Sequence, residues 1–497
     1  MLPYLGLASF VLSLMLVLSG CASSTLAPAP REVRGTWITT TANTAIATPA
    51  DTARTMQRLR EIGLNTVYVE VWKNGYTQHP SKVLARTIGV DRHRNLMPQE
   101  ASELNPSPPR DLTQEMLVEA HRHGLITVAW FEYGFMAAHQ STMTHLRRMK
   151  PEWLSRDIKG NEVAPNGFVW MNPLHPEARQ FLLDLVLEAI DQYDLDGIQL
   201  DDRIVWPYIT MGYDDYTKAA YAREHQGNAP PADAREPAWM RWRAEKVNEF
   251  ARQFVQEVRA KRPGILISLS PAVYPWSWEN YLLAWPQWAA WTEKDRLAGV
   301  SKEAAAITPR WDEFIPQAYR MSYSAFEKTW REQTAFVRTL GRNRQRDLLA
   351  GIRIVGDGND SDWPQLRDSI TLTRTLGNGG HVLWFSRGVL DIFARELSDF
   401  YDVRQAGFVE SPQFPLGWRK SAVALTRGAG FGEWWRSHIA PGRYRLIGFD
   451  GNTWRVIRDV SLVDAGSAAE VRFFVDAPFR QLELILDRRE QSAVARR

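Results

Sequence analysis

The stretch Leu195-Asp196-Gly197-Ile198-Gln199-Leu200-Asp201-Asp202 decides the fold class that this sequence predicts. Its middle is a short apolar strand, its last two residues are carboxylates, and residues 176–193 before it have the spacing of an amphipathic helix. A strand that is apolar on both faces is typical of a parallel sheet that helices cover on both sides. The stretch therefore indicates one helix-and-strand unit of an α/β protein.

The same alternation extends in both directions from this stretch. Strands are predicted at residues 35–39, 65–72, 125–131, 197–200, 265–270, 314–319, 348–354 and 381–385. Helices are predicted at residues 50–61, 112–123, 176–193, 239–261, 324–340, 363–376 and 391–401. This series predicts a (β/α)8 TIM barrel, in which the loops after the strands build the active site. An open doubly wound sheet is the alternative, but no glycine-rich phosphate-binding turn follows any strand.

The pattern changes after about residue 403. Apolar residues alternate with period two at residues 443–447, 454–457, 470–474 and 481–485, with turn residues between them. This predicts a small β-sandwich-like C-terminal domain, residues 403–497, after a barrel domain of residues 32–402. The C-terminal domain could bind glycan or cover one end of the barrel. The charged tail from Arg488 onward is expected to be frayed.

The N-terminal segment has the pattern of a bacterial lipoprotein signal. An apolar run too short to span a bilayer comfortably ends in Leu18-Ser19-Gly20-Cys21, which resembles a lipobox. Cys21 is the single cysteine, so it is the predicted lipidation site and no intramolecular disulfide can form. Residues 1–20 are the predicted signal peptide and residues 21–31 the tether. By resemblance to sorting patterns, Ala22 indicates the periplasmic face of the outer membrane. An ordinary cleaved signal with a chance cysteine is the alternative. The segment before the apolar run is atypical of a signal, because it has no Lys or Arg.

Composition excludes several classes of protein. The chain has 60 Lys and Arg against 57 Asp and Glu, so no basic surface for nucleic acid is expected. Scattered histidines and the absence of Gly-x-Ser-x-Gly after a strand predict neither a metal site nor a Ser-His-Asp hydrolase, and no cofactor. The acidic loop 357–362 leaves calcium binding open beside a solvated loop. The 21 tryptophans favour carbohydrate binding, because flat aromatic faces pack on sugar rings.

Carboxylates at strand ends are the candidate catalytic residues. Glycosidic cleavage needs one carboxyl group that protonates the leaving oxygen and a second that attacks carbon or activates water. Asp201 is the predicted nucleophile or charge stabiliser, and Asp202 orients it, faces a subsite or is the partner acid. Glu132 is the predicted general acid, because burial and neighbouring carboxylates would raise its pKa. Asp196 is expected to be structural, and a buried salt-bridge cluster with Arg203 is the non-catalytic alternative for the whole segment.

Other side chains at strand ends are expected to contact a sugar. They combine hydrogen-bonding groups with aromatic faces. The predicted substrate-binding residues are Glu70, Trp72, Trp130, Gln317, Tyr319, Arg353 and Trp384. Two alternatives stay open: Glu70 could instead pair with Arg353 inside the barrel, and each tryptophan could simply pack.

Several motifs, in order and with sensible spacing, resemble those of the glycosyl hydrolase-like family 10 lipoproteins. The motifs are Arg34-Gly35-Thr36-Trp37, Asn65-Thr66-Val67, Ala129-Trp130-Phe131-Glu132, the stretch 195–202, Ser268-Leu269-Ser270-Pro271 and Ile315-Pro316-Gln317-Ala318-Tyr319. Residues 131–136 and 212–216 look closest to the branch common in cyanobacteria. The sequence departs from many relatives at Glu70 and Glu132, whereas Asp201 and Asp202 match the shared pattern.

The resemblance implies a TIM-barrel glycosidase, and a characterised relative hydrolyses peptidoglycan glycan strands that have lost their stem peptides. The sequence thus predicts a cell-envelope glycoside hydrolase acting on such strands by carboxylate acid/base catalysis. Two alternatives remain, a glycosidase for another extracellular polysaccharide and a non-catalytic glycan-binding lipoprotein. Carboxylates at several strand ends favour catalysis, because binding alone can use neutral amides without desolvating a charge.

Overall fold

The computed structural model describes residues 30–96, 109–412, 422–462 and 470–488. The predicted signal peptide, Cys21 and nearly all of the tether lie outside the described residues. Residues 31–497 belong to one compact unit, separate from residues 1–30. No described helix is both long enough and apolar enough to cross a membrane.

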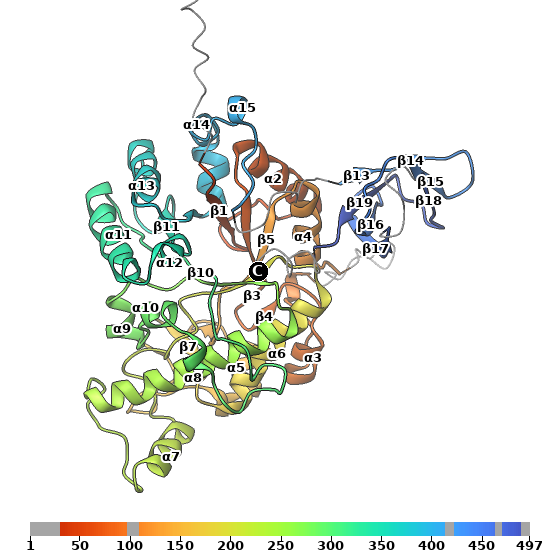
Figure 1. Ribbon diagram of the computed structural model, residues 1–497. Helices are drawn as coiled ribbons and strands as arrows, with labels where there is room; N and C mark the ends of the chain where they lie inside the picture. The colour runs from red at the N-terminus through yellow and green to blue at the C-terminus, as the bar shows by residue number, and fades with distance from the viewer. Residues whose placement is uncertain (1–29, 97–108, 413–421, 463–469, 489–497) are drawn as a thin grey trace, which may run out of the picture. The chain divides into compact units, whose positions relative to one another are not determined.

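The centre of this unit is a barrel of parallel strands, which confirms the predicted fold class. The hydrogen-bonded order is β10-β9-β8-β5-β2-β1-β12-β11, and parallel bridges Phe314–Leu348 and Gln317–Gly351 join the two outermost strands. The strands are β1 (Val33–Ile38), β2 (Thr66–Glu70), β5 (Ile126–Phe131), β8 (Gly197–Leu200), β9 (Leu266–Leu269), β10 (Glu313–Phe314), β11 (Leu349–Arg353) and β12 (Gly380–Trp384). Figure 1 shows strands β1, β5 and β11 within a ring of helices.

The sixth barrel strand is shorter than predicted. Only Glu313–Phe314 forms a regular strand, because Pro316 has no N–H to contribute to a ladder. The backbone beyond it is still held, since Gly351 donates to the Pro316 carbonyl at 3.1 Å and Gln317 donates to the Pro271 carbonyl at 2.9 Å. This irregular end carries Gln317 to the mouth of the barrel.

Long helices cover the barrel close to the predicted positions. Their N-termini are capped by side chains such as Thr48 and Asp362, each of which accepts a backbone N–H. They are α2 (Pro49–Ile62), α4 (Leu112–Arg122), α6 (Pro176–Gln192), α8 (Pro237–Lys261), α11 (Tyr323–Arg338), α13 (Trp363–Leu376) and α14 (Ala394–Phe400). A π-helical turn at Gly388–Ile392 replaces the first part of the helix predicted at 391–401.

The loops after the strands contain smaller elements. Two hairpins lie in them, β3 (Trp72–Lys73) with β4 (Tyr76–Thr77) and β6 (Met136–His139) with β7 (Phe168–Trp170). The remaining helices are α3 (Lys82–Ile88), α5 (His145–Met149), α7 (Asp215–Glu224), α9 (Trp276–Tyr281), α10 (Trp285–Ala289), α12 (Arg342–Arg346) and α15 (Val403–Ala406).

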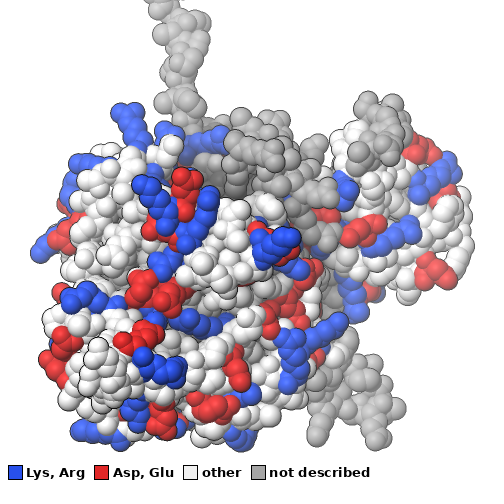
Figure 2. Space-filling view, turned by 60° about the horizontal axis from the view of Figure 1, so that its bottom comes forward, with Lys and Arg blue, Asp and Glu red and all other residues white. Residues whose placement is uncertain are grey.

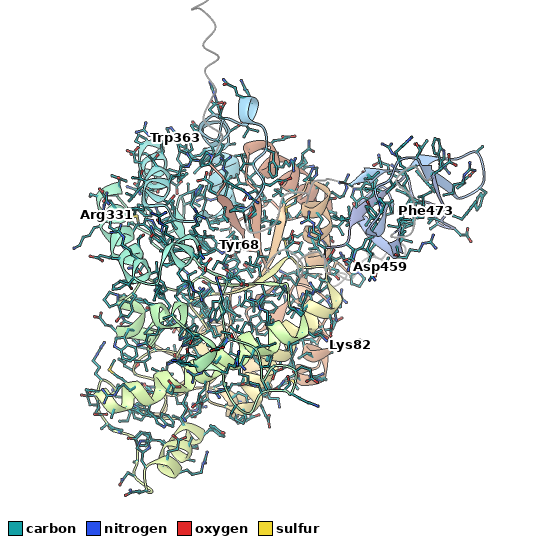
Figure 3. All side chains as sticks on the ribbon, viewed as in Figure 1. Tyr68, Lys82, Arg331, Trp363, Asp459 and Phe473 are labelled. Carbon is teal, nitrogen blue, oxygen red and sulfur yellow. The ribbon has the colours of Figure 1, made fainter. Side chains whose placement is uncertain are left out.

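The barrel interior contains polar as well as apolar side chains. Tyr68 on β2, labelled in Figure 3, donates to Glu313 on β10 at 2.9 Å. Trp37 on β1 donates to Gln199 on β8 at 2.7 Å. Neither pair of strands is adjacent in the sheet, so both bonds cross the interior, which is packed and not a pore.

Many of the described tryptophans fill the core and do not mark a sugar site. Ten of them are less than 2 % exposed: Trp37, Trp72, Trp130, Trp170, Trp206, Trp239, Trp285, Trp288, Trp311 and Trp330. The tryptophan excess thus reflects burial of large apolar surface, and the weight that composition placed on carbohydrate binding was misplaced for these residues.

The C-terminal region forms two antiparallel sheets, as the period-two pattern predicted. One sheet has the order β13-β19-β16-β17 and the other β14-β15-β18; Phe473 on β18 is labelled in Figure 3. The strands are β13 (Val423–Ala424), β14 (Thr426–Arg427), β15 (Glu433–Arg436), β16 (Arg443–Phe449), β17 (Trp454–Ser461), β18 (Val471–Phe474) and β19 (Gln481–Leu486). The domain boundary at residue 403 stays a prediction.

Contacts join these sheets to helix α4 and the barrel. Arg122 of α4 donates to Glu483 at 2.8 Å, and its guanidinium lies 4.1 Å from the Trp454 ring centroid. Arg488 is buried and donates to Asp196 at 2.9 Å, so the prediction that the tail frays from Arg488 is wrong at that residue. These contacts favour the covering role for the C-terminal region.

Acidic and basic side chains are interspersed on the face shown in Figure 2. This agrees with the small net charge of +3. No single-sign field of the kind that attracts nucleic acid is visible on that face.

Candidate active site

Four carboxylates gather where three neighbouring strands end. Glu70 is the last residue of β2, Glu132 directly follows β5, and Asp201 and Asp202 directly follow β8. The three strands are adjacent in the order β2-β5-β8, so their carboxyl ends meet at the mouth of the barrel. This is the face that carries the active site in TIM-barrel enzymes.

Asp201 is almost fully buried and receives several hydrogen bonds. Its Oδ2 accepts from Arg203 Nη1 at 2.7 Å and from Trp130 Nε1 at 3.2 Å. Its Oδ1 accepts from Gln317 Nε2 at 2.6 Å and from the backbone N–H of Asp202 at 2.9 Å. Burial and then the charge of Asp202 raise its pKa well above the usual range. The donors fix the position of both carboxylate oxygens.

Asp202 is the more accessible of the pair. Its side chain is 21 % exposed, against 4 % for Asp201, and the nearest Arg203 nitrogen lies 3.7 Å from its Oδ1. Burial raises the pKa of Asp202, against the opposing effect of Arg203. Two adjacent carboxyl groups with raised pKa values retain a proton to higher pH than ordinary aspartates do. The ion pairs with Arg203 that the non-catalytic alternative expected are present. The Asp202 side chain nevertheless keeps 21 % of its surface exposed.

Glu132 has the opposite electrostatic environment. Its Oε2 lies 2.9 Å from Lys73 Nζ and its Oε1 lies 3.5 Å from Arg203 Nη1. Burial alone would raise its pKa, but the Lys73 and Arg203 charges outweigh burial and lower the pKa. The expected rise is therefore wrong, because two cations flank Glu132. A carboxylate held ionised in this way is unsuited to be the general acid.

Glu70 lies beneath this layer and is fully buried. Its carboxylate accepts from Thr39 Oγ1 at 2.7 Å, from the Thr40 N–H at 3.1 Å and from Lys73 Nζ at 2.9 Å, and also from the Thr40 hydroxyl. Burial and then the Glu132 charge raise its pKa to about 7. With no exposed surface, Glu70 supports Lys73 and Glu132 and does not reach a substrate.

Arg353 does not pair with Glu70. Its Nη2 donates to the carbonyl of Asp357 in its own loop at 2.6 Å, whereas Lys73 takes the place beside Glu70. The alternative of a Glu70–Arg353 pair is thus wrong. Arg353 is 6 % exposed at the end of β11, and its contact with substrate stays a prediction.

Trp72 and Trp130, two of the predicted sugar contacts, instead pack in the core or donate hydrogen bonds. Trp72 has no exposed surface, donates to the Gly134 carbonyl at 3.1 Å and packs edge-on against Phe181 of α6 at 5.8 Å. Its predicted substrate contact is wrong, because it lies between the strand and the outer helix. Trp130 is 1 % exposed and acts as the donor to Asp201, so it positions a carboxylate and offers no face for stacking.

Tyr319 and Trp384 remain candidate sugar contacts. Both are half-buried, and their rings stack at 5.7 Å with an angle of 30°. Trp37 contacts both rings edge-on, at 6.5 Å and 5.8 Å. The pair therefore has a fixed orientation next to Gln317, whose amide holds Asp201.

The sequence argument missed the cations of the site. Lys73 was not predicted, and Arg203 was considered only as a structural partner. The hydroxyl run from Thr39 to Thr41, at the end of β1, was also missed, although it binds Glu70 and Lys73. A signal was present, because each of these residues is the last of a predicted strand or lies one to three positions beyond one.

A polar cavity opens beside Lys73. Its volume is ≈ 320 Å³, and its lining includes Thr40, Thr41, Asn43, Lys73 and His93. Hydroxyl, amide and imidazole groups of this kind can hydrogen-bond sugar hydroxyls. In the part of the chain that the structure describes, no group of three or more His, Cys, Asp or Glu residues is placed to hold a metal ion.

The fold and the carboxylate-rich mouth define the class of protein, a TIM-barrel glycoside hydrolase. The chain matches the model of the family described as Glycosyl hydrolase-like 10 over residues 32–356, and it belongs to that family. The predicted family is confirmed. Lipidation and the cyanobacterial-type branch stay predictions.

Two curated relatives are also named glycosyl hydrolases. Glycosyl hydrolase DigH of Escherichia coli (strain K12) is 22 % identical over 420 residues, which cover 73 % of this chain and 84 % of that protein. Glycosyl hydrolase YngK of Bacillus subtilis (strain 168) is 24 % identical over 267 residues, covering 49 % of this chain. The chain spans about half the length of YngK, 46 %.

A solved structure has a similar fold. The glycoside hydrolase domain of PgaB (BpsB) from Bordetella bronchiseptica superposes with a TM-score of 0.52 at 14 % identity. The match covers 77 % of this chain and all of that domain. At this identity the likeness supports the barrel fold alone.

Proposed function

We propose that this protein is a cell-envelope hydrolase that cleaves glycosidic bonds in peptidoglycan glycan strands, preferentially strands without stem peptides. The observation that carries the proposal is the Asp201–Asp202 pair, in which two adjacent carboxyl groups with raised pKa values differ in exposure at the barrel mouth. Family membership supports the reaction class. The substrate follows from the resemblance of the motifs and from the envelope location that the N-terminal pattern predicts.

Hydrogen bonding assigns different roles to the two carboxyl groups. Four N–H groups hold Asp201 in place, and Asp202 is the more exposed of the two, so Asp202 is the carboxyl group placed to give a proton to the leaving oxygen. Asp202 gives this proton to the leaving oxygen as the C–O bond breaks. Asp201 stabilises the positive charge that develops on the sugar, or attacks the anomeric carbon. Water then supplies hydroxide to that carbon and returns a proton to Asp202.

The remaining residues keep this arrangement in place. Arg203 Nη1 lies within 3.7 Å of carboxylate oxygens on Glu132, Asp201 and Asp202. Lys73 neutralises Glu132 from the other side. This alternation of charges holds Glu132 ionised, so that it contributes orientation and not a proton.

The proposal is tested with the mature chain from Ala22 onward, which contains the whole compact unit 31–497. Intact peptidoglycan, amidase-stripped glycan strands and a panel of neutral polysaccharides are incubated with wild type, Asp201→Asn and Asp202→Asn, and released reducing ends are measured. Release from stripped strands that is abolished in folded Asp201→Asn supports the proposal. Release only from a neutral polymer replaces the substrate. Binding without release from any polymer replaces the enzyme with a glycan-binding lipoprotein.

A further inference from the structure

The loops after β8 and β9, at the end of the barrel that carries Asp201 and Asp202, bring aromatic side chains together. Tyr281, the last residue of α9, lies at the centre of this group. Its ring centroid is 5.3 Å from that of Trp276 and 5.7 Å from that of Tyr208, and both contacts are edge-to-face. Edge-to-face contacts fix the orientation of the rings.

Trp276 differs from the buried tryptophans in its exposure. It is 45 % exposed, and it is the only tryptophan among the exposed large apolar residues in the described ranges. A single exposed apolar residue on a surface needs no explanation. Trp276 is different because it lies in a loop at the carboxyl end of a barrel strand, where this fold binds its substrate.

Tyr281 connects Trp276 to the catalytic pair. Its hydroxyl accepts from Asn166 Nδ2 at 3.1 Å. Burial and then the negative charge of Asp202 raise the pKa of Tyr281 to about 12. Because β8 and β9 are adjacent parallel strands, the aromatic group lies at the same end of the barrel as Asp202, and it extends to the exposed Trp276.

The two loops that carry this group are bonded to each other. The N–H of Trp206 donates to the Tyr281 carbonyl at 3.2 Å, and the N–H of Ile209 donates to the Asn280 carbonyl at 2.8 Å. The side-chain amide of Asn280 in turn donates to the Trp276 carbonyl at 3.0 Å. A face that is ordered before the ligand arrives loses less entropy on binding.

We propose that Trp276 and Tyr281 form a sugar subsite, in which the indole stacks on the apolar C–H face of the pyranose next to the one at Asp202. The inference rests on the proposed function and specifies one of its binding contacts. The ligand class is a pyranose with mainly equatorial substituents, because an axial group would hold the ring away from the indole. The amino sugars of peptidoglycan glycan strands belong to this class.

The test compares Trp276→Ala and Trp276→Phe with wild type on amidase-stripped glycan strands, over a range of strand concentrations. Phe431→Ala is the matched control, since Phe431 is an aromatic residue 93 % exposed in the C-terminal region. Trp276→Ala is expected to raise KM about tenfold with kcat within about twofold of wild type, because stacking is lost and the chemistry is not. Trp276→Phe is expected to give a KM between these two values, and Phe431→Ala is expected to give the wild-type KM.

The outcomes separate the subsite from the proposed function. An unchanged KM in Trp276→Ala, or a lowered kcat with unchanged KM, overturns the subsite while the proposed function stands. If wild type releases no reducing ends, the proposed hydrolase fails, and binding of the same strands in a sedimentation assay decides the subsite. Binding about tenfold weaker in Trp276→Ala then supports the subsite; equal binding, or none in either protein, overturns it. Thermal midpoints confirm that each variant is folded.

Discussion

The two ends of strand β8 carry the same kind of side chain in opposite circumstances. Asp196 stands before the strand, and three donors converge on its Oδ2: Arg488 at 2.9 Å, His121 at 3.1 Å and the Thr127 N–H at 2.7 Å. Burial alone would raise its pKa, but Arg488 and His121 lower it. Asp196 is thus a stable buried anion, as expected of a structural acid.

Asp201 and Asp202 stand after the strand and have raised pKa values. One arginine, Arg203, serves both of them and Glu132 as well. The difference teaches that burial by itself does not mark a functional acid. What separates Asp196 from the pair is how many cations each carboxylate contacts: Arg488 and His121 both contact Asp196, whereas Asp201 and Asp202 share Arg203 with Glu132. In the proposed function, the amino end contributes stability and the mouth carries the reaction.

The largest expected effect that sharpens this comparison is the loss of activity in Asp201→Asn. An amide cannot stabilise or capture the positive charge that develops on the sugar, so kcat should fall by about 10³-fold or more. Reducing-end release from stripped glycan strands measures it. The same substitution at Asp196 should leave kcat per folded molecule within about twofold. Comparable losses at both positions would refute the division of roles.

The next effect is on stability, and it comes from the other end of the strand. Asp196→Asn removes the anion that Arg488 and His121 both contact and should lower the free energy of unfolding by about 3–5 kcal/mol. Urea denaturation at pH 7 measures it. Asp191→Asn is the control, because Asp191 is 60 % exposed in its ion pair with Lys261 and should lose less than about 1 kcal/mol. A loss of that small size in Asp196→Asn would contradict the structural role.

How far the sequence could anticipate this contrast depends on where each partner lies in the chain. The strand, its terminal carboxylates and the structural nature of Asp196 follow from local pattern, because period, flanks and strand position are local properties. Arg488 lies 292 positions beyond Asp196, in a tail that composition marks as frayed. No local pattern could pair the two.

The sign of a pKa shift is harder to predict than the location of a site. Proximity of carboxylates and aromatic rings predicted a raised pKa at Glu132. The sign reversed because Lys73 sits 2.9 Å from both Glu132 and Glu70, and the lysine belongs to a hairpin that the sequence did not predict. Strand positions locate the titratable groups, whereas side-chain packing decides which cation reaches which group.

A third prediction concerns Glu70, whose pKa is raised like those of Asp201 and Asp202. Its folded pKa of about 7 lies above the ordinary value of 4.5, so the folded state holds a proton that the unfolded chain releases. The stability this proton contributes is fully present below pH 4.5 and is lost as the pH rises through 7. Between pH 5 and 8 the loss should reach about 2–3 kcal/mol.

The measurement is urea denaturation at both pH values for wild type and Glu70→Gln. The amide does not titrate, so the variant should lose this part of the pH dependence. The surface variant Asp191→Asn serves as control and should keep the wild-type slope. A Glu70→Gln profile parallel to wild type would show that Glu70 is ionised throughout. The cations near Glu70 would then stabilise its charge as fully as Arg488 and His121 stabilise that of Asp196.

The smallest expected effect is a gain in the free energy of unfolding, opposite in sign to the loss expected for Asp196→Asn. It therefore distinguishes the two ends of β8 most clearly. Asp202→Asn replaces a carboxyl group whose charged form burial disfavours, and the nearest Arg203 nitrogen, at 3.7 Å, is too far for a hydrogen bond. At pH 7 the folded state should gain about 1 kcal/mol, since sites strained for function are stabilised when the functional group is lost. The same chemical change at Asp196 is destabilising. If Asp202→Asn also destabilised the fold, the mouth carboxylates would be structural anions like Asp196, and the assignment of Asp202 as the proton donor would lose its electrostatic basis.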